Sequence, residues 1–176
     1  MNPGMTADTA PPRVRFHRFE VAIATFIVVI DQITKALVRA HVPLYDTVPI
    51  IGGVLNLTHV RNTGAAYGFL NAVDFPFKSV VLALVATAAF IGIAFYAARV
   101  APHERVARLG LTIILGGAIG NLIDRLALGS VVDWVDVVFG SWHFWAFNVA
   151  DAAITLGVAA MMIDMMRTTR HVPTTS

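Results

Sequence analysis

The chain has 176 residues, of which 57% are hydrophobic and 14% are charged, and its mean hydropathy is +0.71. This apolar share exceeds that of a soluble domain and indicates a membrane protein. The net charge is +2, but the basic residues flank apolar segments and form no stripe with aromatic residues, which argues against nucleic-acid binding. The absence of cysteine excludes disulfides, a thiol nucleophile and thiolate metal ligands.

The chain divides into two short tails and one apolar domain. Residues 1–18 are polar and contain three prolines, so we expect a disordered cytoplasmic tail there. Residues 19–168 are expected to form a single four-helix membrane domain, and residues 169–176 a second cytoplasmic tail. The candidate spans, each with about 20 mostly apolar residues, are Phe19–Val38, Pro76–Ala98, Val106–Leu126 and Trp145–Met166.

The distribution of arginines predicts the orientation of these spans. An even number of spans places both termini on one side, and eight of the thirteen basic residues flank that side. Cytoplasmic loops carry the excess of Lys and Arg, so both termini are expected in the cytoplasm. The eight residues are Arg13, Arg15, Arg18, Arg99, Arg105, Arg108, Arg167 and Arg170.

The segment between the first two spans, about residues 40–75, is then extracytoplasmic. Its stretch from Val48 to Val60 alternates apolar and polar residues around Gly52-Gly53, a pattern typical of short strands joined by a turn. The expected fold class is therefore an all-α membrane protein with four transmembrane helices and a small extracytoplasmic β-sheet and loop region between helices 1 and 2. That segment could form a surface platform and a flap over a site.

Ionisable residues interrupt three of the four spans. A charged side chain in hydrocarbon costs at least about 2.5–3.5 kcal/mol, so such residues are functional candidates. At about 1.5 Å per helical residue, Asp124 and Asp151 each lie roughly 24 Å from the cytoplasmic arginines of their spans. Lys35 comes to about the same depth, with Asp31 one turn deeper. The polar groups therefore gather toward the outer leaflet.

Sequence spacing places several of these polar residues on shared helical faces. Asn121, Asp124 and Arg125 stand at i, i+3 and i+4, and Asn148 and Asp151 repeat the i, i+3 relation. Two Asn-x-x-Asp faces thus meet from antiparallel helices. Two further acids, Asp133 and Asp136, follow Gly129 in the external segment 127–144 and can fold back over the same level.

Structural interpretations compete with functional ones for most of these residues. Asp31 and Lys35 are four residues apart and can neutralise each other, and Asp124 can be the ion-pair partner of Arg125. Asp136 is expected to be a solvated or interfacial loop acid. Asp151 has no basic residue within a helical turn, so a purely structural role explains it least well.

Two carboxyl groups in one apolar site supply an acid and a base, because they cannot both ionise readily. Such a pair can activate water and protonate a leaving amine, which is the chemistry of peptide hydrolysis. The residues alone leave open whether Asp124 or Asp133 is the partner of Asp151. A four-helix transporter with an acidic proton relay is the main alternative, and a structural subunit is a weaker one. There is no H-E-x-x-H or G-x-S-x-G motif, and no cofactor or metal is expected.

Five blocks of the sequence, in this order, resemble the lipoprotein signal peptidase (signal peptidase II) family. They are Asp31-Gln-Ile-Thr-Lys35, Arg61-Asn-Thr-Gly-Ala-Ala-Tyr-Gly68, Gly116-Gly-Ala-Ile-Gly-Asn-Leu-Ile-Asp-Arg125, Val131-Val-Asp133 and Phe147-Asn-Val-Ala-Asp151. The resemblance implies an intramembrane aspartyl endopeptidase of the bacterial inner membrane. Its substrates would be diacylglyceryl prolipoproteins, cleaved just before the lipid-modified cysteine.

The resemblance also implies roles for individual residues. Asp133 and Asp151 match the family's catalytic aspartates. Supporting or substrate-binding positions fall on Asp31, Lys35, Asn62, Asn121, Asp124, Arg125 and Asn148. We further expect contact with membrane lipids, no nucleic-acid partner, a monomeric enzyme and an active site near the outer face of the membrane.

Overall fold

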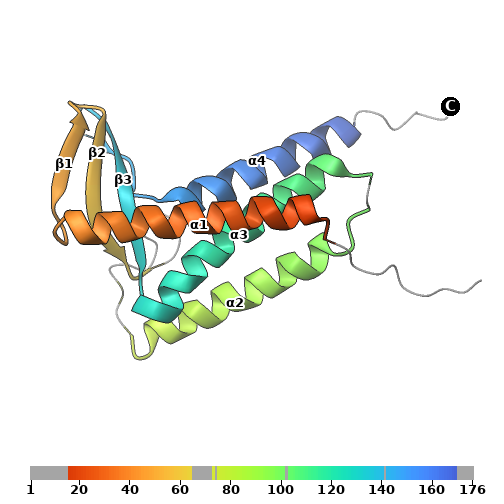
Figure 1. Ribbon diagram of the computed structural model, residues 1–176, viewed down its shortest axis with the longest axis horizontal. Helices are drawn as coiled ribbons and strands as arrows, with labels where there is room; N and C mark the ends of the chain where they lie inside the picture. The colour runs from red at the N-terminus through yellow and green to blue at the C-terminus, as the bar shows by residue number, and fades with distance from the viewer. Residues whose placement is uncertain (1–15, 65–72, 74, 102, 141, 170–176) are drawn as a thin grey trace, which may run out of the picture.

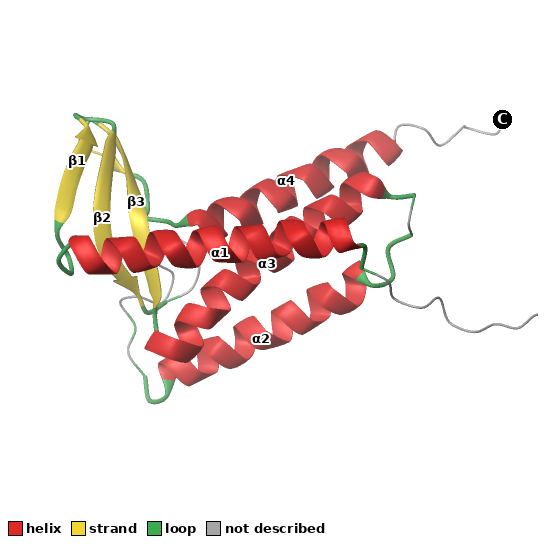
Figure 2. Cartoon of the chain, viewed as in Figure 1, coloured by secondary structure: helices red, strands yellow, loops and turns green. Residues whose placement is uncertain are grey.

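The computed structural model describes residues 16–64, 73, 75–101, 103–140 and 142–169. This part of the chain folds into helices and strands in the order α1 (Arg18–His41), β1 (Thr47–Ile51), β2 (Leu55–Asn62), α2 (Lys78–Ala97), α3 (Arg105–Leu128), β3 (Val131–Phe139), β4 (Trp142–His143) and α4 (Val149–Thr169). Figure 1 shows an elongated bundle of helices with the strands lying across one end, and Figure 2 separates the helical and strand layers by colour.

All four predicted spans are helices long and apolar enough to cross a membrane. Their bounds differ from the predicted ones by a few residues. α1 runs on to His41 and stops where Val42 becomes extended before Pro43, since the residue before a proline disfavours the helical region. α4 begins at Val149 rather than Trp145, because Phe147 is extended and its backbone N–H donates to the carbonyl of Val135, 3.0 Å away.

The predicted tails fall almost wholly outside the described residues. Of residues 1–18 only 16–18 are described, and Arg18 already begins α1; of residues 169–176 only Thr169 is described, and it ends α4. Residues 65–72 and 74, part of the segment 40–75 that is expected to supply a platform and a flap, also lie outside the described residues.

α3 is the central helix of the bundle and packs against each of the other three. Small residues let it approach α4 closely: a Cβ at Gly110 would lie 2.9 Å from the carbonyl oxygen of Gly157, and one at Gly157 would lie 2.6 Å from that of Gly110. Such close backbone approach is the usual role of glycine between membrane helices. The glycine-rich face of α3 is therefore a packing surface, and it fixes α4 against α3.

The strands form one antiparallel sheet in the order β1-β2-β3-β4. The predicted hairpin is β1 and β2, with Gly53 in the left-handed region (φ 72°) at its turn. The predicted sheet lacked its third strand: β3 lies between α3 and α4 in sequence and pairs along β2, with Asn62 opposite Val131 and Val60 opposite Asp133. The structure is therefore a mostly helical membrane protein with a small antiparallel sheet.

Candidate active site

Asp133, the third residue of β3, is 2% exposed. Its Oδ2 accepts a hydrogen bond of 3.0 Å from the side-chain amide of Asn62 on β2, and its Oδ1 accepts one of 2.7 Å from the amide of Asn148. Burial and, next, the negative charge of Asp151 raise the pKa of Asp133 to about 7, while the two amide hydrogen bonds and the charge of Lys35 act in the opposite direction. This carboxyl group therefore exchanges its proton near neutral pH.

Asp151 stands in the first turn of α4, where it and Asn148 bond to each other. The backbone N–H of Asp151 donates to Asn148 Oδ1 at 2.9 Å, and the backbone N–H of Asn148 donates to Asp151 Oδ2 at 3.3 Å. This reciprocal arrangement works as a capping box, because it satisfies two backbone donors at the start of the helix. The other oxygen, Asp151 Oδ1, accepts a 2.7 Å hydrogen bond from the amide of Asn121 on α3.

Asn148 connects the two acids. It is fully buried, and its amide nitrogen donates to Asp133 while its amide oxygen accepts from the backbone of Asp151. The same nitrogen also lies 3.2 Å from Asn121 Oδ1. These contacts orient the amide nitrogen toward the Asp133 carboxyl group and the amide oxygen toward the backbone N–H of Asp151, so one side chain joins the start of α4 to strand β3.

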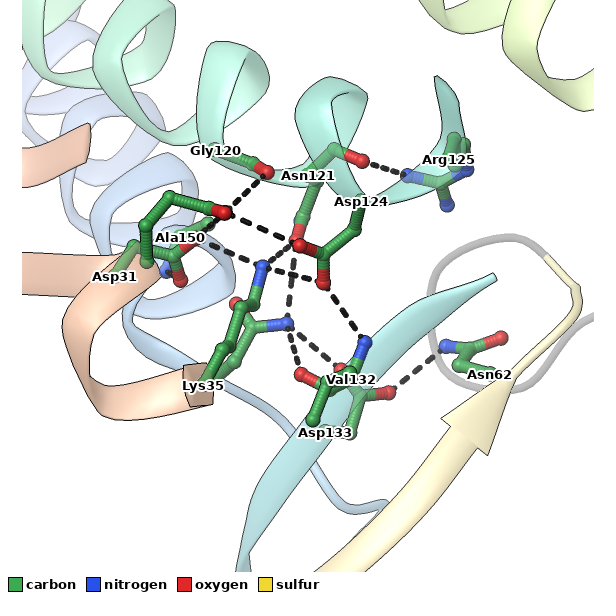
Figure 3. A network of polar contacts seen from close by, with 12 residues as sticks. Asp31, Lys35, Asn62, Gly120, Asn121, Asp124, Arg125, Val132, Asp133 and Ala150 are labelled. Atoms are coloured by element: carbon green, nitrogen blue, oxygen red, sulfur yellow. Dashed lines mark hydrogen bonds and ion pairs between the residues drawn. The ribbon is translucent and has the colours of Figure 1, made fainter. Parts of the chain in front are cut away.

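Lys35 of α1 is fully buried, and it reaches this pair of acids through Asn121. Its ammonium group is 2.8 Å from Asp31 Oδ2 and 3.2 Å from Asp124 Oδ2, and it donates a 2.9 Å hydrogen bond to Asn121 Oδ1. One cation thus serves two buried carboxylates, which is tolerable only if hydrogen bonds satisfy the remaining oxygens. Figure 3 shows the ammonium group between the two acids.

Each of these two carboxylates also accepts a hydrogen bond from a backbone N–H group. Asp31 Oδ1 accepts from the N–H of Ala150 at 2.9 Å, and Asp124 Oδ2 accepts from the N–H of Val132 at 3.0 Å. Each N–H belongs to the residue immediately before one of the two candidate catalytic aspartates (Figure 3). The ion cluster therefore holds the backbone on which each aspartate is mounted.

Arg125 lies at the edge of the same network. Its guanidinium donates to the carbonyl of Asn121 at 3.5 Å and to the carbonyl of Gly64 at 3.4 Å, which links α3 to the turn after β2. In that turn the backbone N–H of Gly64 donates to the side-chain oxygen of Asn62 at 2.9 Å. Asn62 is thereby oriented with its nitrogen toward Asp133.

The structure brings every predicted site residue into this connected group of hydrogen bonds and ion pairs. Its members are Asp31, Lys35, Asn62, Asn121, Asp124, Arg125, Asp133, Asn148 and Asp151. The predicted pairing of Asp31 with Lys35 is present. The alternative pairing of Asp124 with Arg125 is wrong, because the Asp124 carboxylate is bound to Lys35 and to the backbone of Val132.

Asp136, predicted as a solvated or interfacial loop acid, instead lies on a strand and is buried. It is 8% exposed, on β3, and its carboxylate accepts from the amide of Asn56 at 2.9 Å and lies 3.1 Å from His143 Nδ1. The reason is the unpredicted third strand, which places Asp136 between β2 and β4. It is not joined to the group around Asp133 by any hydrogen bond among the described residues.

Sequence reasoning missed Gln32. Its amide nitrogen lies 3.2 Å from Asp31 Oδ2, 3.1 Å from Asp124 Oδ1 and 3.1 Å from the carbonyl oxygen of Gly120, so it shares its donors among α1 and α3 acceptors. A polar amide next to an intramembrane acid was the available signal, since such a group in a span needs a partner. Among the described residues no cluster of three His, Asp or Glu is arranged to hold a metal ion.

Comparisons with known proteins agree on one family. The profile of the family described as Signal peptidase (SPase) II matches residues 23–167. A lipoprotein signal peptidase of Geobacter metallireducens is 43% identical over 162 residues, covering 91% of this chain and 96% of that protein. One of Nitratidesulfovibrio vulgaris is 42% identical over 151 residues, covering 86% and 91%.

Solved structures extend the likeness to the fold. A bacterial membrane enzyme determined by the in meso method at 2.3 Å resolution superposes with a TM-score of 0.80 at 28% identity, covering 95% of this chain and 99% of its own. The match spans the four helices and the sheet that together carry Asp133, Asp151 and the buried ion cluster. The chain belongs to the lipoprotein signal peptidase (signal peptidase II) family.

Proposed function

We propose that the chain is an aspartic endopeptidase in which Asp133 and Asp151 share one proton and activate a water molecule. The ionised carboxylate takes a proton from the water as its oxygen attacks the scissile carbonyl carbon. The protonated carboxyl group then gives its proton to the leaving nitrogen, and the carbon–nitrogen bond breaks. Protons balance, because one enters the dyad from water and one leaves to the amine.

The observation that carries this proposal is that one buried residue contacts both acids. The Asn148 side chain donates to the Asp133 carboxyl group and accepts from the backbone N–H of Asp151, and the backbone N–H of Asn148 donates to the Asp151 carboxyl group. The pKa of Asp133 near 7, raised by burial and by the charge of Asp151, is consistent with a group that holds the shared proton at neutral pH and releases it during the reaction.

The supporting residues fall into three groups in this proposal. Asp31, Lys35 and Asp124 hold the backbone before each catalytic aspartate, and Asn121 and Asn148 orient the carboxyl oxygens. Asn62, which binds Asp133 from β2, and Arg125, which binds the turn after β2, are the proposed contacts of the substrate backbone. No residue from a second copy is needed to complete the dyad, which supports a monomeric enzyme.

The substrates we propose are bacterial prolipoproteins, cut just before the diacylglyceryl cysteine. Their lipid and signal helix already reside in the bilayer, so they can reach the site by lateral diffusion among membrane lipids. We also propose that both termini are cytoplasmic and that the site faces the outer side of the inner membrane. The first residue of α1 and the last residue of α4 lie at the end of the bundle opposite the sheet (Figure 1). The α2–α3 connection lies there too; it contains Arg99 and is followed by Arg105 and Arg108 in α3.

The transporter alternative would need acids distributed along a path through the membrane. Instead the acids of the network gather at the sheet end of the bundle, and Glu20 at the other end is engaged by Arg108 at 2.7 Å. This distribution supports a reaction site over a conduit.

The test is cleavage of a purified diacylglyceryl prolipoprotein by the wild type, Asp133→Asn and Asp151→Asn. Asp136→Asn is the matched control, since it removes a buried acid from the same strand. We expect the first two variants to lose roughly 10²–10⁴-fold or more in rate and the control to keep its activity. Equal activity of Asp133→Asn and the wild type, with both variants folded, would refute the assigned dyad.

A further inference from the structure

The end of the sheet farthest from the dyad carries a compact group of exposed apolar side chains. Ile50 and Ile51 end β1, Val54 precedes β2, and Phe139 and Trp142 flank the β3–β4 turn. The backbone N–H of Val138 donates to the carbonyl of Val54 at 2.8 Å, so the two turns lie side by side. We call these five residues the apolar tip. Ile50 is 58% exposed and Phe139 is 62% exposed.

The apolar tip lies well away from the reacting groups. β3 carries Asp133 near its start and Phe139 at its end, six residues later, which at about 3.3 Å per residue separates them by about 20 Å. Figure 1 shows the strands running across the helix axes, with the β1–β2 turn projecting past the start of α4. The β1–β2 turn therefore projects sideways from the bundle, beyond the start of α4.

Its composition suits a boundary between lipid and water. Residues 47–57 contain no charged residue, and residues 137–145 contain only His143 as an ionisable one. Tryptophan prefers this boundary, where its ring is apolar and its N–H remains hydrated. Phe139 and Trp142 also contact each other, with ring centroids 5.8 Å apart, so they present one joint aromatic surface. The opposite end of the sheet has the contrasting composition, with Arg61, Asn62 and Asp133.

The edge strand β1 is also better suited to contact with lipid than to exposure to water. All five residues of β1 are exposed, and its sequence is Thr-Val-Pro-Ile-Ile. An exposed apolar edge strand in water invites pairing with other chains, and Pro49 removes only one backbone donor from it. Coverage by lipid would remove this hazard. The apolar tip also resembles the surface of the helices in composition, since Phe26 is 67% exposed and Leu126 is 69% exposed there.

We propose that the apolar tip inserts into the interfacial layer of the bilayer that holds the helices, so that the sheet is anchored to lipid at the end remote from the dyad. The helices fix one end of the sheet and the bilayer supports the other. The proposal does not depend on the cleavage chemistry, and it fails or holds independently of the assignment of Asp133 and Asp151.

The test uses nitroxide labels on single cysteines, which are unique because the chain contains no cysteine. Ile51→Cys and Phe139→Cys report on the tip, and Arg61→Cys, an exposed position at the other end of the sheet, is the control. Labelled protein is reconstituted in liposomes without substrate. Collisions with oxygen, which concentrates in lipid, are compared with collisions with a water-soluble nickel chelate.

We expect both tip labels to favour oxygen over the chelate several-fold more than the Arg61 label does. Tip labels that meet the chelate as readily as the control label would overturn the proposal, because the tip would then be in water. Shielding from both reagents, with spin–spin broadening that disappears on dilution with unlabelled protein, would also overturn it, because a second copy of the chain would then cover the tip.

Discussion

Two ion clusters join α1 to α3, one at each end of the bundle, and they differ in what else they bind. At the end remote from the sheet, Arg108 and Glu20 form a pair with two contacts of 2.7 Å, and Arg108 also donates to the carbonyl of Val100 at 3.1 Å. Each side chain is 10% exposed. This cluster connects helix ends and the adjacent connection, and nothing in it touches the dyad.

The cluster at the sheet end is built around Lys35, which is fully buried and shared by Asp31 and Asp124. Each acid extends the cluster to a backbone N–H in another element, one in α4 and one in β3. The difference shows how the same kind of interaction serves two purposes. A simple pair fastens helices, whereas a shared cation with two acids holds the backbone beside the two proposed catalytic aspartates.

The largest effect is expected from Lys35→Met. The substitution leaves Asp31 and Asp124 buried without their cation, which costs about 3–5 kcal/mol in comparable buried pairs. We expect a marked fall in thermal stability in detergent and loss of prolipoprotein cleavage even below the unfolding temperature. Adding Asp124→Asn to Lys35→Met should recover part of the stability. If Lys35→Met unfolds at the same temperature as the wild type, the role given to this cation is contradicted.

Asp133→Asn is expected to change stability in a pH-dependent way. The folded protein keeps the Asp133 proton up to about pH 7, whereas an ordinary carboxyl group releases it near pH 3.8, so the wild type loses stability as the pH rises between these values. The amide variant has no such loss. From pH 4 to above pH 7, the difference in unfolding free energy should shift in favour of the variant by on the order of 4 kcal/mol. Unfolding measured across this range checks the trend, and a pH-independent difference would contradict it.

The smallest effect is expected from Arg108→Met at the other end. Glu20 keeps its 2.9 Å hydrogen bond from the backbone N–H of His17 and partial access to solvent, so the loss should be about 1–2 kcal/mol. The cleavage rate of the folded variant should equal that of the wild type. A loss of cleavage as large as that of Lys35→Met would remove the distinction between the two clusters.

The sequence predicted the helices and the gathering of their acids at one level, because both predictions rest on local patterns. Long apolar runs are specific for spans, and the i, i+3 and i, i+4 spacings within α1, α3 and α4 place polar groups on one face regardless of tertiary contacts. The β1–β2 hairpin was also predictable, since alternation and a Gly-Gly turn lie within a dozen residues.

What the sequence could not provide depended on contacts between distant segments. β3 pairs with β2 some 70 positions earlier, and its nearly continuous apolar run gives no alternation, so residues 131–139 were assigned to a loop. Without β3, the sequence predicts Asp136 in a loop. It also leaves open whether Asp124 or Asp133 is the partner of Asp151. In the structure Asp124 is committed to Lys35 and to the backbone of Val132, which supports Asp133 as the partner.

The order of the elements along the chain has a consequence for biosynthesis. Asp151 stands on α4, which is made after the helices that carry Asp31, Lys35 and Asp124. Because Asp31 and Lys35 pair within one turn of α1, that helix carries a neutralised pair when it enters the bilayer. A chain interrupted before α4 would have the buried cation and its two carboxylates but would lack Asp151. The proposed dyad is therefore completed only after α4 has been synthesised.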